Sequence, residues 1–193
     1  MDFRQRIFQF RSYTPLPFLA LMVWFARPTA SSMLIGGLVV ILGEVIRLWG
    51  VSIAGSETRT TGPVGGTQLV TTGPFGYVRN PLYVGNMLIY TGVGVMSMAL
   101  FPWLALGALA FFFGQYTAIV SLEEEHLRQK FGEEYDRYTG AVPRFFPLPK
   151  KYVGEQRTQP KLEWQRGIIS EKSTLLAIVC VTALLIVMLM FRG

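Results

Sequence analysis

Two polar stretches hold most of the side chains that could bind a small charged molecule. The first, Thr71 to Gly85, reads TTGPFGYVRNPLYVG and combines a glycine-rich turn with an arginine, a proline and the start of an apolar run. The second, Ser121 to Pro147, reads SLEEEHLRQKFGEEYDRYTGAVPRFFP and is rich in charge. Two apolar segments joined by one proline-containing turn separate them, so both ends should return to the same membrane face. We therefore expect the two stretches to meet there and to hold a small polar cofactor.

Each of these side chains suits a different group of a charged ligand. The fork of Arg79 matches a carboxylate, whereas Glu123 and Glu124 suit an ammonium group or a sugar diol. The face of Tyr83 can stabilise a cation without offering a nucleophile. Taken singly, each also has a structural interpretation: the glutamates as a solvated helix end, the arginine as a lipid-headgroup anchor, the tyrosine as an interfacial aromatic.

The amino-acid sequences of both stretches resemble those of one family of membrane enzymes. RNPLYVG at Arg79 to Gly85 is followed, one helical hairpin later, by Glu123 and Glu124, FGEEY at Phe131 to Tyr135 and VPRFFP at Val142 to Pro147. This order is similar to that of the isoprenylcysteine carboxyl methyltransferases and their phospholipid methyltransferase relatives. The resemblance covers roughly residues 43–147 and implies a methyltransferase that uses S-adenosylmethionine.

The resemblance also implies roles for individual positions. It assigns cofactor binding to Arg79, Pro81, Tyr83, Gly85, Glu123 and Glu124, and Asn80 within the first motif is a further cofactor-binding candidate although it does not match the family pattern. Arg144, in VPRFFP, matches a position that is often basic. With Arg47 it is our candidate for the catalytic site, where either arginine would steer the acceptor. No metal site is expected.

Asn80 stands where the family pattern usually has the histidine of Arg-His-Pro. An asparagine amide still donates and accepts hydrogen bonds, but it does not titrate near neutral pH as histidine does. A carboxylate acceptor has a pKa of about 4 and arrives deprotonated, whereas an amine must first lose a proton to a base. The one histidine, His126, is expected at the surface beside the acidic pair. The sequence therefore favours O-methylation of a lipophilic carboxylate, and the resemblance implies an isoprenylcysteine-like acceptor.

Two ionisable residues interrupt the apolar run from Met33 to Ala54. Glu44 and Arg47 lie at i and i+3 and so share one helical face. Charges inside a membrane are costly and usually face a partner or a cavity. Two interpretations stay open: the residues neutralise each other as a structural pair, or Arg47 helps to hold an anionic group of the cofactor or the substrate.

Composition indicates an integral membrane protein. The chain of 193 residues is 51% hydrophobic with a mean hydropathy of +0.37, and several windows reach the roughly 20 apolar residues that a bilayer-spanning helix needs. The net charge of +6 comes mostly from basic residues beside the predicted spans. Membrane lipids, not nucleic acid, are therefore the expected partners of this charge.

An all-α fold with about five transmembrane helices is expected, over residues 12–26, 33–54, 82–101, 103–122 and 174–191. Pro81 should open the third span, because its missing N–H does no harm at a helix start. Gly132 should end the helix that extends beyond the fourth. If the first segment crosses, most basic residues share one side, and the positive-inside rule makes that side cytoplasmic.

The chain is expected to form a single membrane methyltransferase domain over residues 1–193. Its parts are N-terminal spans within 12–54, a cofactor-binding core over 71–147, a cytoplasmic segment over 148–172 and a C-terminal span over 174–191. Residues 1–11 should form a short helix on the lipid surface, and 160–166 a short surface helix. The expected location is a bacterial or archaeal cell membrane, with the cofactor site facing the cytoplasm and the acceptor entering from the bilayer.

Other functions stay open at this point. Phospholipid N-methylation of the phosphatidylethanolamine type and thiol S-methylation would use the same cofactor. A non-catalytic protein of the same fold would bind lipid or support assembly. A sterol reductase relative would use a nicotinamide cofactor, although the chain is short for that class.

Overall fold

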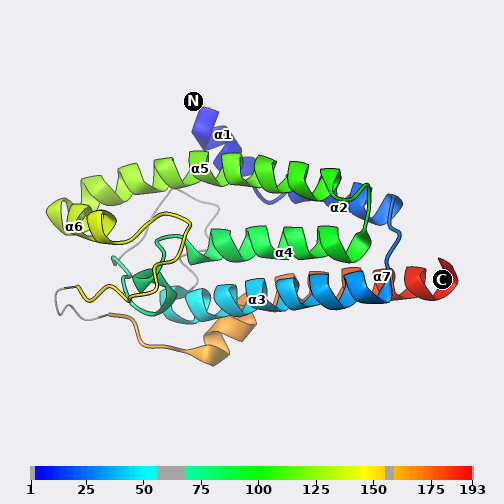
Figure 1. Cartoon of the computed structure of the whole chain (residues 1–193). Helices are drawn as coiled ribbons and strands as arrows, with labels where there is room; N and C mark the ends of the chain where they lie inside the picture. The colour runs from blue at the N-terminus through cyan, green and yellow to red at the C-terminus, as the bar shows by residue number, and fades with distance from the viewer. Residues whose placement is uncertain (1–2, 56–67, 155–158, 193) are drawn as a thin grey trace.

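Helices make up all the regular structure in the computed structural model, which describes residues 3–55, 68–154 and 159–192 (Figure 1). In chain order they are α1 (Phe3–Phe10), α2 (Pro15–Trp24), α3 (Ala30–Ala54), the 3-10 helix η2 (Gly73–Gly76), α4 (Pro81–Ser97), α5 (Trp103–Phe131), α6 (Glu133–Ala141) and α7 (Trp164–Arg192). No strand occurs within these ranges. The all-α prediction is therefore confirmed.

Three of these helices, α3, α5 and α7, are long and apolar enough to cross a membrane by length and composition. The other two apolar helices are shorter, with 10 residues in α2 and 17 in α4. At 1.5 Å per residue they extend about 15 and about 26 Å, against a hydrocarbon core of about 30 Å. The structure thus supports a membrane protein, and five crossings stay a prediction.

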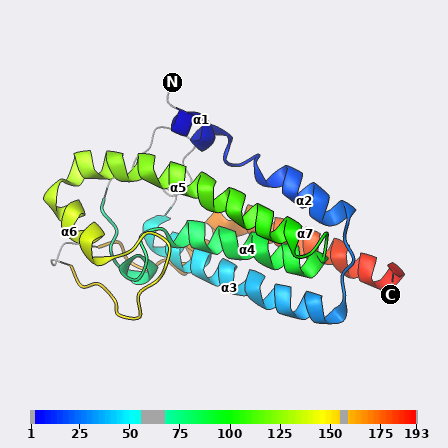
Figure 2. The same ribbon diagram turned by 45° about the horizontal axis from the view of Figure 1, so that its top comes forward.

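The helices α3, α4 and α5 run alongside one another, and α7 packs against α3 (Figures 1 and 2). Glycines bring α3 and α4 together. A Cβ atom added to Gly43 would lie 2.7 Å from the carbonyl oxygen of Gly85, and one added to Gly85 would lie 2.6 Å from that of Gly43. Gly36 and Gly92 repeat this arrangement two turns away, at 2.5 and 2.7 Å. Only glycine permits so close an approach of two helix backbones.

Two predicted starts and stops are confirmed. α4 begins at Pro81 and α5 ends at Phe131, directly before Gly132, whose φ of 53° lies in the left-handed region. The predicted end of α4 near residue 101 is wrong, because the helix stops at Ser97. Met98 and Leu100 have φ values of 52° and 45°, which a right-handed helix does not accommodate.

Two helices differ from the prediction. α6 was not expected, yet it follows α5 directly and carries three acidic residues in its first turn, where the helix dipole stabilises them. Of the predicted surface helix over 160–166, residues 160–163 are not helical, whereas residues 164–166 and the predicted span over 174–191 belong to one continuous helix, α7. No proline interrupts the polar stretch between them, and Glu171 within that stretch is fully buried.

The N-terminal helix α1 is present as predicted, but it also packs against protein. Phe8 is only 6% exposed and belongs to the main hydrophobic core, and Arg4 forms an ion pair of 3.2 Å with Glu125 of α5. Figure 2 shows α1 beside α5. The sequence TTGPVG at Thr60 recurs as TTGPFG at Thr71. The first copy lies outside the described residues, and the second contains η2.

Candidate functional site

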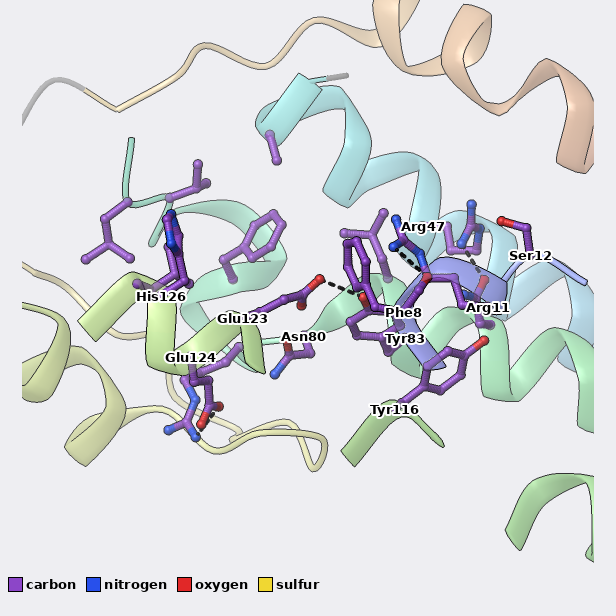
Figure 3. Close-up of a pocket in the computed structure, with 18 of the residues that line it drawn as sticks. Phe8, Arg11, Ser12, Arg47, Asn80, Tyr83, Tyr116, Glu123, Glu124 and His126 are labelled. Carbon is purple, nitrogen blue, oxygen red and sulfur yellow. Dashed lines mark hydrogen bonds and ion pairs between the residues drawn. The ribbon is translucent and has the colours of Figure 1, made fainter. Parts of the chain in front are cut away.

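A cavity of about 540 Å³ lies where the two polar stretches meet (Figure 3). Its lining comes from α1 to α7, from η2 and from the segments on either side of η2. This volume falls within the range of about 300–1,000 Å³ that is usual for small-molecule sites. The cavity therefore has room for a cofactor.

The predicted meeting of the two stretches is confirmed. Arg79 Nη2, before α4, lies 2.9 Å from Glu124 Oε1 on α5. One turn further along α4, the Tyr83 hydroxyl donates a hydrogen bond of 2.9 Å to Glu123 Oε1. All four of these residues line the cavity, as does Asn80.

Glu124 is shared by two arginines. Its second partner is Arg144, whose Nε and Nη2 donate to the two carboxylate oxygens at 3.0 and 2.6 Å. Glu124 is 8% exposed, so both of its oxygens are held within the protein. These hydrogen bonds raise the pKa of Arg144 above its ordinary value.

Arg79 ties the turn before α4 to the chain after α6. Its Nη1 donates to the carbonyl oxygens of Thr139 and Val142, both at 2.8 Å, and its backbone N–H donates to Pro143 at 2.8 Å. The buried Nε of Arg79 has no hydrogen-bond partner among the described atoms. The two Nη atoms of Arg79 therefore join the two polar stretches, and the Nε–H group makes no hydrogen bond to the described residues.

Glu123 differs from its neighbour. Within residues 3–55, 68–154 and 159–192, Tyr83 is its hydrogen-bond donor and no arginine or lysine forms an ion pair with it. The Tyr83 ring in turn stacks on Tyr116, with centroids 4.6 Å apart. Glu123 is thus the acidic residue of the pair whose charge the cavity can offer to a ligand.

Three predicted site residues do not line the cavity: Pro81, Gly85 and Arg144. Pro81 is buried at the start of α4, and Gly85 faces α3, where an added Cβ would lie 2.5 Å from Arg47 Cγ. Arg144 reaches the site only through Glu124 and through its carbonyl oxygen, which accepts a hydrogen bond of 3.2 Å from Asn80 Nδ2. The structure gives these residues supporting positions.

Arg47 lines the other part of the cavity, among the membrane helices. Its Nη2 donates to both oxygens of Glu171 on α7, at 2.9 and 2.7 Å, and its Nη1 donates to Asn86 Oδ1. The predicted contact with Glu44 is present, with 3.7 Å between Nε and Oε2. Glu171 was placed in a cytoplasmic segment by the sequence. Extending the helical periodicity of the last apolar run backwards would have brought it onto the same helix.

Aromatic residues surround the part of the cavity nearest α6. Tyr135 and Tyr138 of α6 line it together with Phe75. Burial raises the pKa of both tyrosines above their ordinary values, so the hydroxyls stay protonated, and that of Tyr138 donates to the Phe75 carbonyl oxygen at 2.7 Å. His126, expected at the surface, is half-buried and also lines the cavity.

Sequence reasoning missed several cavity residues, which come from α1, from the turn after it and from the apolar faces of α4 and α5: Phe8, Arg11, Asn86, Tyr90 and Tyr116. Metal ligation has no support in the described part of the chain, where no three His, Cys, Asp or Glu residues are grouped to hold an ion.

Comparison with known proteins assigns the family. Residues 31–134 match the model of the phospholipid methyltransferase family, and this stretch covers more than half of the chain and contains both Arg79 and the acidic pair. The chain belongs to this family. The resemblance noted from the two motifs is thereby confirmed.

Two bacterial relatives share part of this sequence. The chain is 36% identical over 120 residues to the nickel-cobalt-cadmium resistance protein NccN of Alcaligenes xylosoxydans xylosoxydans, covering 62% of this chain and 51% of the relative. It is 38% identical over 122 residues to the cobalt-zinc-cadmium resistance protein CzcN of Cupriavidus metallidurans, covering 63% and 51%. The chain thus spans about half the length of these relatives. No solved structure matches it.

Proposed function

We propose that this protein is an integral-membrane methyltransferase that uses S-adenosylmethionine to O-methylate a carboxylate on a lipophilic, isoprenylcysteine-like acceptor. Membership of the phospholipid methyltransferase family supports the reaction class. The observation that carries the proposal is that Glu123 and Tyr83 meet inside one cavity that reaches from the α6 tyrosines to the membrane helices.

The residues present fit S-adenosylmethionine. Glu123 offers a carboxylate for its ammonium group or ribose diol, and the α6 tyrosines with Phe75 offer aromatic surface for adenine. The faces of Tyr83 and Tyr116 suit a sulfonium cation, and the leftover Nε of Arg79 suits a carboxylate. When bound, the cofactor supplies an electrophilic methyl group.

The membrane-facing part of the cavity fits a lipophilic acceptor. Ile89, Leu82 and Tyr90 of α4 line it, together with Arg47 and Asn86 as polar groups. A carboxylate needs no base, only alignment with the methyl group. In this proposal Arg47 contributes a polar wall beside the acceptor, and Arg144 acts by holding Glu124.

Phospholipid N-methylation is the second candidate, because His126 and Glu123 both line the cavity. Either side chain could accept the proton that an amine must lose. Asn80, which replaces the histidine of the family pattern, cannot act as this base. The two relatives are named for resistance to metals, and these names do not select an acceptor.

The stability of the methylated product in alkali distinguishes O-methylation from N-methylation. Purified protein in liposomes would receive cofactor with a labelled methyl group and one of three acceptors: a prenylcysteine, a fatty acid or phosphatidylethanolamine. We expect the prenylcysteine or the fatty acid to be labelled. Alkali should release this label as methanol, because it hydrolyses a methyl ester. Alkali-stable label on phosphatidylethanolamine alone would contradict O-methylation and support N-methylation.

Binding measurements address the remaining classes. S-adenosylhomocysteine should raise the melting temperature of the protein in detergent, since a ligand at 100 times its Kd adds about 2.7 kcal/mol of stability. Stabilisation by NADPH instead would favour a reductase. No stabilisation and no methyl transfer to any acceptor would favour a non-catalytic protein.

A further inference from the structure

The segment directly before η2 forms a wall of the cavity that lies outside both polar stretches. Gln68, Leu69 and Val70 of this segment line the cavity. Leu69 is 6% exposed and belongs to one hydrophobic cluster with Tyr135 and Tyr138 of α6. This wall therefore packs beside the aromatic surface that the proposed function assigns to the adenine of the cofactor.

One side chain from much later in the chain holds the backbone of this wall. The Gln159 amide donates from Nε2 to the Leu69 carbonyl oxygen at 3.2 Å, and its Oε1 accepts a hydrogen bond of 3.0 Å from the Thr71 N–H. These two backbone groups lie on either side of Val70, so the amide bridges that residue much as a neighbouring β-strand would. Gln159 thus fixes the wall at two points.

Gln159 belongs to the connection between α6 and α7, which is attached to the bundle on both sides of it. Before it, the Tyr152 N–H donates to the Gly76 carbonyl oxygen of η2 at 2.8 Å. After it, the Glu163 N–H donates to the Ser52 carbonyl oxygen of α3, also at 2.8 Å. These two attachments keep the Gln159 amide within reach of the wall.

The hydrogen bonds of Gln159 affect the cavity only through the residues that they hold. Gln159 itself does not line the cavity, whereas Leu69 and Val70 do. A loop without such bonds occupies several conformations, and the apparent affinity for a ligand falls with the fraction of the conformation that binds it. Two hydrogen bonds of ordinary net strength are enough to change this fraction about tenfold.

We propose that Gln159 is a positioning residue for the cofactor, whose amide holds the backbone around Val70 so that this wall fits the cofactor beside the α6 tyrosines. The inference rests on the proposed function, because that function assigns this end of the cavity to S-adenosylmethionine. It concerns the affinity for the cofactor. Acceptor binding, in the membrane-facing part of the cavity, should not depend on Gln159.

Two measurements on the purified chain in detergent test this proposal. Calorimetric titration with S-adenosylhomocysteine gives a Kd, and hydrogen exchange at the Thr71 amide reports its hydrogen bond to Gln159. Q159M keeps the length of the side chain but removes both hydrogen bonds. We expect Q159M to bind S-adenosylhomocysteine about tenfold more weakly and to exchange the Thr71 amide faster. Wild-type protection in α4 would show that Q159M is folded.

Gln165 supplies a control of the same residue type, since it is exposed at the start of α7 and does not line the cavity. Q165M should keep the wild-type Kd and the wild-type exchange at Thr71. Q159E retains an oxygen that can accept the Thr71 hydrogen bond, so it should recover part of the protection and part of the affinity. Equal losses of affinity in Q159M and Q165M would overturn the proposal, because they would indicate a general effect on this end of the protein.

Kinetics separate a positioning role from a structural one wherever an acceptor is methylated. Q159M should raise KM for S-adenosylmethionine and leave kcat and the KM of the acceptor at their wild-type values. A lower kcat with an unchanged KM for the cofactor would contradict the proposal, because it would place the effect of Gln159 after cofactor binding.

The outcomes distinguish this inference from the proposed function. Wild-type affinity for S-adenosylhomocysteine in Q159M would overturn only the role of Gln159, and so would unchanged exchange at Thr71. No binding of S-adenosylhomocysteine by the wild type would overturn both the inference and the cofactor assignment. Weaker binding in Q159M, together with no methyl transfer to any acceptor by the wild type, would support the role of Gln159 and contradict the methyltransferase.

Discussion

Arg47 on α3 and Glu171 on α7 form a two-point ion pair, with 2.9 and 2.7 Å between Arg47 Nη2 and the two carboxylate oxygens. Glu171 is fully buried, and the two residues are 124 positions apart in the chain. Because α7 packs chiefly on α3, this pair joins the C-terminal helix to the wall of the cavity. Arg47 thus links the wall of the cavity to the attachment of α7.

Removing one partner of this pair should destabilise the protein strongly. E171A leaves the Arg47 charge buried with less compensation, and such losses are typically about 3–5 kcal/mol. Thermal or denaturant unfolding in detergent would measure the change. The control is E163A, whose ion pair with Arg166 is well exposed and should be worth about 1 kcal/mol or less. Similar losses in both variants would contradict a special role for the buried pair.

Replacing Arg79 should separate the two polar stretches and abolish cofactor binding. R79A removes the contacts to Glu124 and to the carbonyl oxygens of Thr139 and Val142. We expect loss of the stabilisation by S-adenosylhomocysteine. R128A, which breaks an exposed pair with Asp136 on the same side of the molecule, should retain it. An unchanged ligand response in R79A would refute the assignment of the site.

Glu123 should contribute charge to binding and little to the fold. E123Q keeps an oxygen that can accept the Tyr83 hydrogen bond but removes the negative charge. We expect binding of S-adenosylhomocysteine to weaken about tenfold or more, with little change in the melting temperature of the unliganded protein. The matched control is E133Q, which lies outside the cavity lining and is exposed on α6, with an ion pair of 3.9 Å to Arg137. Equal affinities in E123Q and E133Q would argue against a cofactor role for Glu123.

Alanine should have opposite effects at two kinds of helical glycine. G43A places a Cβ 2.7 Å from the Gly85 carbonyl oxygen, and overpacking of this kind usually costs about 1–3 kcal/mol. G107A, on α5, has no atom within 4 Å of the new Cβ and should stabilise its helix by up to about 1 kcal/mol. Unfolding midpoints of the two variants would show the sign. A stabilised G43A would mean that α3 and α4 separate easily.

Local chemistry in the sequence determined where the hairpin of α4 and α5 begins and ends. Pro81 can start a helix but cannot continue one, and Gly132 adopts a φ of 53° that ends another. The apolar lengths between these points return both polar stretches to one end of the bundle, and this is why the contact between Arg79 and Glu124 could be expected. The order of the motifs, which the family shares, indicated the reaction class.

Tertiary packing alone decided which charges the protein uses internally and which ones face the cavity. Arg144 and Arg79 converge on Glu124, while Glu171 reaches Arg47 across 124 positions. Arg11 enters the site because its segment is pinned to α5, through contacts such as that between Thr14 and Gln115. No helical or turn pattern encodes such pairings, because periodicity fixes the face of a helix but not the neighbour that this face meets.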